Sequence, residues 1–231
     1  MQNKNNFYFL GICLVIASIV ISLGFSSINP KEASVSVRGL AQREVNADLA
    51  VWQLSFGLGD NKLENLQKSI KEKSEIVSLY LKDKGLNERD FSVLSPSITN
   101  NLLDPYINQE KMQYIYIAKL NFLIRTDKIS AVKKANEGLL ELVDKGIAIK
   151  QDYENKINYE FTKLNDIKPE MIALATKNAR KAAEQFAKDS NSNLGKIKHA
   201  TQGLFSIENA ATGLEERKIV RVVTQIQYLL K

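Results

Sequence analysis

The sequence AVWQLSFGL, residues 50–58, decides the fold of this chain. Its even-numbered residues are all apolar: Ala50, Trp52, Leu54, Phe56 and Leu58. Most of the residues between them are polar or small. Successive side chains of a strand point to opposite faces of a sheet, so the pattern places five apolar side chains on one face. The stretch therefore predicts a strand that is covered on one side.

Further strands and helices follow this stretch. Apolar residues recur every three or four positions in helices and every second position in half-buried strands. The predicted elements are a helix from Leu63 to Gly85, strands over Phe91–Ile98 and Met112–Ile124, a helix over Lys128–Lys145 and a strand over Ile147–Phe161. The core-facing residues expected in the second helix are Ile129, Val132, Leu139, Leu140 and Val143. The order βαββαβ predicts a ferredoxin-like unit, in which two helices cover one face of an antiparallel sheet.

The two ends of the chain are predicted to form a second layer. A strand pattern over Val35–Val45 contains Gly39, which indicates a bulge or a close backbone approach. A third helix starts near Asp166 and Pro169, and its expected inner face is Ile172, Ala175, Ala179, Ala182, Ala183, Phe186 and Ala187. Strands over Leu194–Phe205 and Lys218–Leu230 follow, with a hairpin tip at Ala210–Glu216. The expected fold class is α+β: a ferredoxin-like βαββαβ unit plus a second α/β layer formed by the N-terminal strand and the C-terminal helix and strands.

Residues 7–28 carry no formal charge and are long enough, as a helix, to span a bilayer. We expect residues 1–6 to form a cytoplasmic tail, 7–28 a transmembrane anchor or uncleaved signal, 29–34 a linker and 35–231 an ectodomain, with two interlocked subdomains as one option. Lys4 favours a cytoplasmic N-terminus and an ectodomain in the periplasm or extracytoplasmic space. Cleavage of the segment stays open, although no clear small-residue cleavage site precedes Lys31.

The composition points away from several classes of protein. The net charge is +6, without a block of five like charges, so we expect no nucleic-acid partner. Cys13 is the only cysteine and lies in the apolar segment, and His199 is the only histidine. Metal sites of the zinc type draw on several such ligands. We therefore expect no metal, no cofactor and no disulfide in the ectodomain.

No residue is assigned a catalytic role. His199 stands beside lysines without a nucleophile or an orienting partner in its motif, so we interpret it as a solvated side chain. Four acids could form a carboxylate pair for hydrolysis, but we interpret them as ordinary solvated turn acids: Asp83, Glu88, Asp90 and Asp104. Five tyrosines could stack bases, but we expect them to lie on core faces: Tyr106, Tyr114, Tyr116, Tyr153 and Tyr159.

Several short motifs, in their order and spacing, resemble the SIMPL domain family of bacterial periplasmic and envelope proteins, which includes the periplasmic immunogenic proteins. The motifs are Val35-Ser36-Val37-Arg38-Gly39 with Asp48, Lys84-Gly85-Leu86, Val143-Asp144-Lys145-Gly146, Ala179-Arg180-Lys181-Ala182-Ala183-Glu184 and Leu194-Gly195-Lys196-Ile197. Asn46 and Ala41 depart from the family pattern around the first turn. The resemblance implies an α+β fold, export, ring-like or channel-like oligomers and loose links to stress tolerance. It implies no catalytic residues.

These observations favour a non-enzymatic, membrane-anchored envelope protein that self-associates and is loosely linked to envelope or oxidative-stress tolerance. The partners expected are the membrane, through the N-terminal helix, and further copies of the chain. Long alternating strands without proline, Met112–Ile124 and Lys218–Leu230, suggest pairing through exposed sheet edges. Two alternatives stay open: an envelope hydrolase or redox enzyme, and a binding module for an anionic polymer.

The topology predicts the behaviour of a reporter fused after Lys231. A reporter that is active only outside the cytoplasm should be active in this fusion, because residues 7–28 would carry the ectodomain across the membrane. Activity of a cytoplasm-specific reporter at the same position would contradict the assignment. Mass spectrometry of the mature N-terminus separates an anchor from a cleaved signal.

Overall fold

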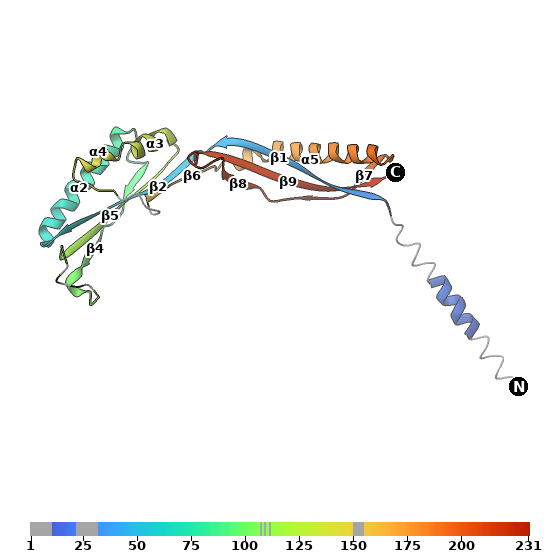
Figure 1. Cartoon of the computed structure of the whole chain (residues 1–231), viewed down its shortest axis with the longest axis horizontal. Helices are drawn as coiled ribbons and strands as arrows, with labels where there is room; N and C mark the ends of the chain where they lie inside the picture. The colour runs from blue at the N-terminus through green and yellow to red at the C-terminus, as the bar shows by residue number, and fades with distance from the viewer. Residues whose placement is uncertain (1–10, 22–31, 107, 109, 111, 150–154) are drawn as a thin grey trace. The chain divides into compact units, whose positions relative to one another are not determined.

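The computed structural model describes residues 11–21, 32–106, 108, 110, 112–149 and 155–231 (Figure 1). Residues 11–21 are helical and exposed. In the part of the chain that is described, no helix is both long and apolar enough to cross a membrane. Much of the predicted anchor, residues 7–10 and 22–28, lies outside the described residues.

The chain divides into two compact units. Unit 1 comprises residues 1–40, 172–203 and 223–231, and unit 2 comprises residues 41–171 and 204–222. Three of the boundaries fall inside β1 (Ser34–Asn46), β9 (Arg217–Leu230) and the helix α5 (Leu164–Asp189), and the fourth follows Gly203. Each unit therefore combines segments that lie far apart in the sequence.

Unit 2 is built on the strand predicted from residues 50–58. This strand, β2 (Leu49–Asp60), pairs antiparallel with β5 (Tyr116–Thr126) and β6 (Ile157–Glu160), and the sheet order is β3-β5-β2-β6. The short strands β3 (Phe91–Val93) and β4 (Ser97–Asn100) both pair with β5. Trp52 and Leu54 are fully buried, which confirms the predicted alternation.

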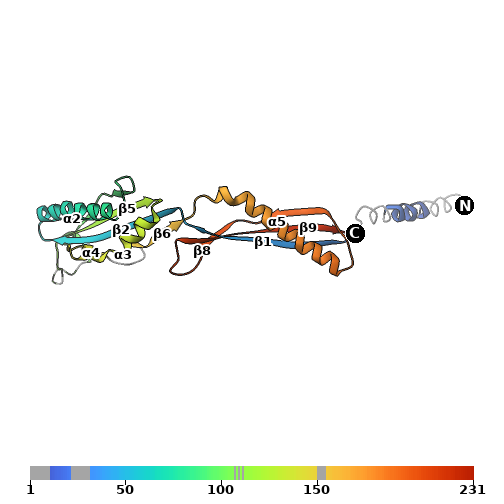
Figure 2. The same cartoon turned by 90° about the horizontal axis from the view of Figure 1, so that it is seen from above.

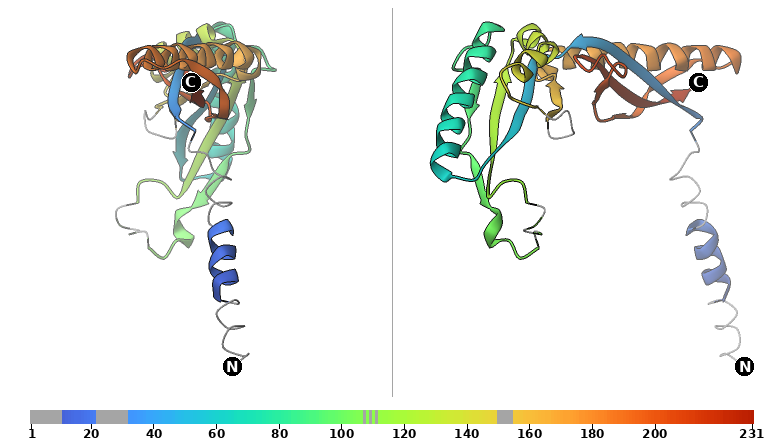
Figure 3. Two further views of the ribbon diagram at one scale, coloured as in Figure 1. Left: turned by 90° about the vertical axis from the view of Figure 1, so that its right-hand side faces the viewer. Right: turned by 60° about the vertical axis from the view of Figure 1, so that its left-hand side comes forward.

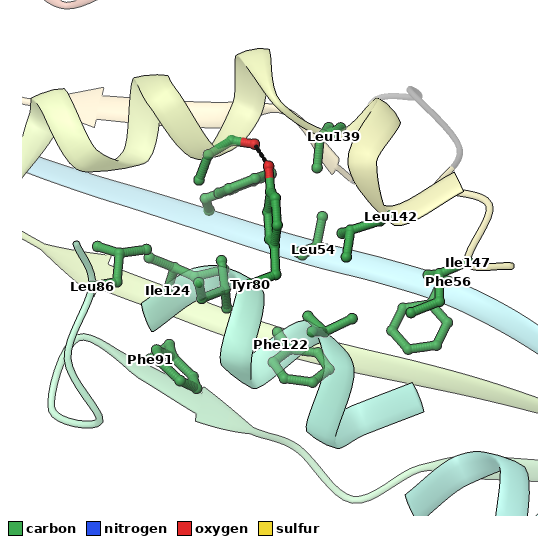
Figure 4. Close-up of a cluster of buried hydrophobic side chains, with 14 of the residues drawn as sticks. Leu54, Phe56, Tyr80, Leu86, Phe91, Phe122, Ile124, Leu139, Leu142 and Ile147 are labelled. Carbon is green, nitrogen blue, oxygen red and sulfur yellow. Dashed lines mark hydrogen bonds between the residues drawn. The ribbon is translucent and has the colours of Figure 1, made fainter. Parts of the chain in front are cut away.

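Helices cover the apolar face of this sheet. They are α2 (Leu63–Asp83), α3 (Ile129–Glu137) and α4 (Leu140–Val143), and Figure 3 shows α2 lying along the strands. Phe122 stacks against Phe56, with ring centroids 6.3 Å apart, and lies near Phe91 (Figure 4). The Tyr80 hydroxyl donates a hydrogen bond of 2.5 Å to the Ala135 carbonyl, and burial raises the pKa of Tyr80 to about 12. Tyr80 therefore joins α2 to α3 as a neutral phenol.

The mixed α/β class is confirmed, whereas several elements of unit 2 differ from their predictions. The predicted strand Phe91–Ile98 is two strands, β3 and β4, and the predicted helix Lys128–Lys145 is two helices that break at Gly138. A Cβ at Gly138 would lie 2.9 Å from the Tyr80 hydroxyl, so the backbone passes close to that side chain. The ferredoxin-like arrangement in detail stays a prediction.

Two predicted core residues of the second helix are wrong. Leu140 is 78% exposed and Val143 is 51% exposed, whereas Leu139 and Leu142 are buried. Helix α4 begins anew after Gly138, so the apolar phase of α3 does not continue into it.

The predicted strand Ile147–Phe161 is also too long. Within its described residues, 147–149 and 155–161, Ile157–Glu160 is the one strand, and Ile149 makes an isolated bridge to Phe56. Residues 150–154 lie outside the described residues.

Unit 1 is a sheet covered by one helix. Strand β9 lies between β1 and β7 (Leu194–Gln202), and β8 (Ser206–Asn209) in unit 2 pairs with the first half of β9. Figure 2 shows α5 running along β1 and β9. Its buried stripe has a spacing of four residues: Met171, Ala175, Ala179, Ala183 and Ala187. The predicted third helix is thus confirmed in kind, but it starts at Leu164 and contains Pro169.

The inner face predicted for α5 is wrong at two positions. Ala182 and Phe186 are exposed, and Phe186 exposes 53% of its surface. A stripe of four-residue spacing keeps only one row of alanines against the sheet. The small side chains of that row let the helix approach β1 closely.

Gly39 shows how close this approach is. A Cβ built on Gly39 would lie 1.9 Å from the Ala175 carbonyl oxygen and 2.8 Å from the Ala179 Cβ. The predicted close backbone approach is therefore confirmed.

We expect Gly39→Ala to lower the free energy of unfolding by about 3 kcal/mol, because the added methyl group would force α5 away from β1. Gly57→Ala in β2 is the matched control, since a Cβ there would lie 3.9 Å from its nearest neighbour. Urea unfolding followed by circular dichroism measures both. Equal stability of the two variants would contradict the close packing.

Candidate functional site

His199 lies on an exposed surface of β7. Its Nε2 is 3.0 Å from the Thr201 hydroxyl, and the residue is exposed. The contact places a hydroxyl beside the ring on one solvent-facing row of the strand, but among the described residues no further hydrogen bond orients the ring. The position agrees with the interpretation of His199 as a solvated side chain.

The four acids considered for hydrolysis each have a partner of their own. Glu88 is 2.7 Å from Lys82, Asp83 is 3.5 Å from Lys84, and Asp104 accepts a hydrogen bond from the Tyr106 backbone. These are surface ion pairs and a turn contact.

Asp90 is the most enclosed of the four acids, and its side chain is only 13% exposed, so the interpretation as a solvated acid is wrong for this residue. Its carboxylate accepts hydrogen bonds from the Lys128 ammonium group at 2.6 Å, the Thr126 hydroxyl at 2.9 Å and the Asn87 backbone at 2.6 Å. Burial opposes ionisation, but these hydrogen bonds outweigh it and lower the pKa of Asp90. The carboxylate ties the turn before β3 to the end of β5.

The prediction that all five tyrosines lie on core faces is wrong for two of them. Tyr106 is 95% exposed and Tyr114 is 39% exposed, whereas Tyr116 and Tyr159 pack against the core of unit 2. Burial raises the pKa of Tyr159, and the nearby carboxylates of Glu216 and Glu215 raise it further. Tyr153 lies outside the described residues. Of the described tyrosines, Tyr116 lies in β5 and Tyr159 in β6, so the described tyrosines do not share one strand.

No group of three His, Cys, Asp or Glu side chains that could hold a metal ion occurs among the described residues. Cys13 is exposed within the helical residues 11–21.

Unit 2 contains a hollow of about 630 Å³. Its apolar wall includes Trp52, Leu139, Ile149, Ile157 and Tyr159. The Asn155 side chain accepts hydrogen bonds from the backbone and the hydroxyl of Ser55, and the Asn155 carbonyl accepts one from the Trp52 indole. These bonds hold Asn155, two residues before the start of β6 (Ile157–Glu160), against β2, where it shapes the hollow. Sequence reasoning missed Asn155, because an isolated asparagine carries no periodic signal.

The most distinctive surface of unit 1 is the edge of its sheet. Among the described residues, β7 pairs only with β9, and none of its nine residues is buried. The core of unit 1 lies over β1 and β9, where Val35, Ile226 and Tyr228 meet the alanine row of α5. The narrow helix therefore leaves β7 exposed along most of its length, although Leu194 at its start packs against the core.

The sheet face opposite α5 is polar across three strands. The Gln227 amide donates to the Ser34 hydroxyl at 2.8 Å, and the Gln225 amide donates to the Ser36 hydroxyl at 3.2 Å. His199 of β7 lies opposite Gln227 in the register. These rows join β1, β9 and β7 on one face.

The two strands named for edge pairing are not edges. The predicted strand Met112–Ile124 begins at Tyr116 and lies between β2 and β3, and Lys218–Leu230 lies within β9, between β1 and β7. That part of the prediction is wrong, because alternation records which faces of a strand are covered and not whether a neighbour pairs with its edge. In the sheet that contains β9, as far as the structure describes it, the outer edges belong to β1 and β7.

The fold and its surfaces define a mixed α/β protein with two antiparallel sheets, in which the described side chains present an open strand edge and a small hollow. The chain belongs to the SIMPL family: the family model, described as a protein of unknown function (DUF541), matches residues 35–224. No curated protein matches the chain.

Asp90 predicts a pH dependence of stability. Its folded pKa is lowered, so its stabilising effect is complete above the ordinary aspartate pKa and is lost as the pH falls through the folded value. We expect the free energy of unfolding to fall below about pH 4 more steeply in the parent chain than in Asp90→Asn. Urea unfolding at pH 7 and at lower pH tests this, and parallel pH curves for the two chains would contradict it.

Proposed function

We propose that this protein is a non-enzymatic envelope component that self-associates through the open edges of its unit 1 sheet, outside the cytoplasm and anchored by residues 7–28. The observation that carries the proposal is the exposed edge strand β7, which pairs on one side only in the described part of the chain. An unpaired strand edge offers a row of backbone donors and acceptors to another chain.

The two open edges suggest how copies would pair. Strand β1 ends the sheet on one side of β9 and β7 ends it on the other. Pairing of β1 in one copy with β7 in the next would be head-to-tail, and such an interface closes into a ring when the rotation between copies permits. This geometry supports the ring-like oligomers that family membership implies.

Features of β7 restrict which partner it accepts. Lys196 and Lys198 are exposed on it, and the register with β9 shifts before His199. Lysines and irregularities on edge strands oppose indiscriminate pairing. The regular stretch, His199–Gln202, is therefore the part that we expect to pair.

The enzyme alternative has less support. Neither His199 nor the four acids gathers a nucleophile, a base and an orienting group, which hydrolysis of this type requires. Family membership and the uncharged segment support the anchored, extracytoplasmic location and a loose link to stress tolerance.

A single proline tests the edge. The Gly203 N–H donates to the Val223 carbonyl, and the register is regular back to Ala200, so the alternating N–H of Ala200 points away from β9. Ala200→Pro would remove that outward donor without breaking the ladder to β9. Ala200→Ser, which keeps the donor, is the matched control.

We expect the parent chain and Ala200→Ser to sediment as oligomers, and Ala200→Pro to sediment as a smaller species with an unchanged circular dichroism spectrum. Sedimentation velocity over a range of micromolar concentrations measures this for the full chain in detergent and for residues 31–231. A monomeric parent chain at every concentration would contradict self-association. An unchanged oligomer in Ala200→Pro would contradict pairing through β7.

A further inference from the structure

Lys218 is a buried cation in unit 2 that forms no salt bridge with any carboxylate of the described residues. It is 7% exposed, and its ammonium group donates a hydrogen bond to the Asn209 side-chain carbonyl. An ammonium group has three donors, and a buried charge is costly unless it is paired. Burial lowers the pKa of Lys218, and the more distant carboxylates of Glu215 and Glu160 oppose that effect only in part.

Lys218 lines a second hollow of about 410 Å³. The hollow lies between four consecutive residues at β6, 156–159, and the β8–β9 hairpin. Consecutive residues of a strand point to opposite faces, so both faces of β6 contribute to the lining. The hollow therefore borders the outer edge of β6, which is the last strand in the sheet order. The full lining is Lys156, Ile157, Asn158, Tyr159, Asn209, Glu215 and Lys218.

The charges around this hollow are unbalanced toward positive. It has two ammonium groups, from Lys156 and Lys218, and one carboxylate, from Glu215. The Glu215 carboxylate accepts a hydrogen bond from the Gly213 backbone and is held in the hairpin turn. Among the described residues, neither lysine forms a salt bridge with it. The Glu160 carboxylate, which accepts a hydrogen bond from Asn158, acts on Lys218 only from beyond salt-bridge distance. The lining itself therefore carries one more positive than negative charge.

We propose that this hollow binds a monocarboxylate with a short apolar body, whose carboxylate is held by the ammonium group of Lys218 and assisted by Lys156. The amides of Asn209 and Asn158 supply further hydrogen bonds, and Ile157 and Tyr159 contact the apolar body. A monoanion matches the net charge of the lining, whereas the Glu215 carboxylate would repel a phosphate dianion. The volume suits a compact ligand rather than a long acyl chain.

Three probes distinguish the ligand class and its source. Hexanoate represents a free apolar acid, N-acetyl-alanyl-alanine represents the terminal carboxylate of a peptide, and inorganic phosphate represents other oxyanions. Calorimetric titration of the full chain measures each affinity. We expect saturable binding of at least one carboxylate and weaker binding of phosphate; tighter binding of phosphate, or no saturable binding of either carboxylate, would overturn the proposal.

Two variants test the role of Lys218. Lys218→Met keeps the length of the aliphatic stem but removes the charge, and Asn209→Asp places a competing carboxylate beside the ammonium group. Either change should weaken carboxylate binding by about tenfold or more, since charge-assisted hydrogen bonds carry an effect of that size. Asn209→Asp keeps the lysine and supplies it with a partner, so it tests the site even if Lys218→Met fails to fold.

Lys71→Met is the matched control, because Lys71 is exposed on α2 and its loss changes the net charge equally. It should leave carboxylate affinity unchanged. Emission from Trp52, the only tryptophan, reports whether the core of unit 2 is intact in every variant. Equal affinities for the parent chain, Asn209→Asp and Lys71→Met would overturn the assignment of Lys218.

Discussion

The contact between Gly39 and α5 is the constraint on which unit 1 depends. The helix lies so near β1 that a methyl group at Gly39 would overlap the Ala175 carbonyl. Only a row of alanines on the helix and a glycine on the strand permit that distance. The core of unit 1 is therefore thin, and most of its apolar contact comes from β1 and β9 rather than from the helix.

This close, narrow packing explains why most of β7 is exposed. A helix that contacts a sheet through one row of small side chains covers two strands, and of the β7 residues Leu194 packs against the core. The core of unit 2 is packed differently, because large side chains such as Trp52 and Phe122 fill the space beneath several helices. Hollows occur in both units, and the unit with the thinner core presents the exposed strand β7.

Apolar packing alone does not explain the burial of two polar side chains in unit 2, Asn155 and Lys218. Asn155 serves Trp52 and Ser55, so its burial is matched by hydrogen bonds within the protein. Lys218 is enclosed to a similar degree but is matched only by the amide of Asn209. A signal for Lys218 was present in the sequence, because it shares the apolar phase of Val220 and Val222 in β9. A cation in that phase is unusual for a half-buried strand.

The sequence by itself determined the class of fold, the strand over residues 50–58, the helix α2 and the alanine-rich face of α5, because local periodicity records which side of an element is covered. Only the tertiary structure decided where Lys128–Lys145 breaks, how little of Ile147–Phe161 is a strand and which strands are edges. These features depend on contacts between residues far apart in the chain, such as Tyr80 beside Gly138 and β9 between β1 and β7. The pattern of apolar residues along the sequence specifies which face of a helix or strand is covered. Which strand pairs with its edge is decided only when the chain has folded.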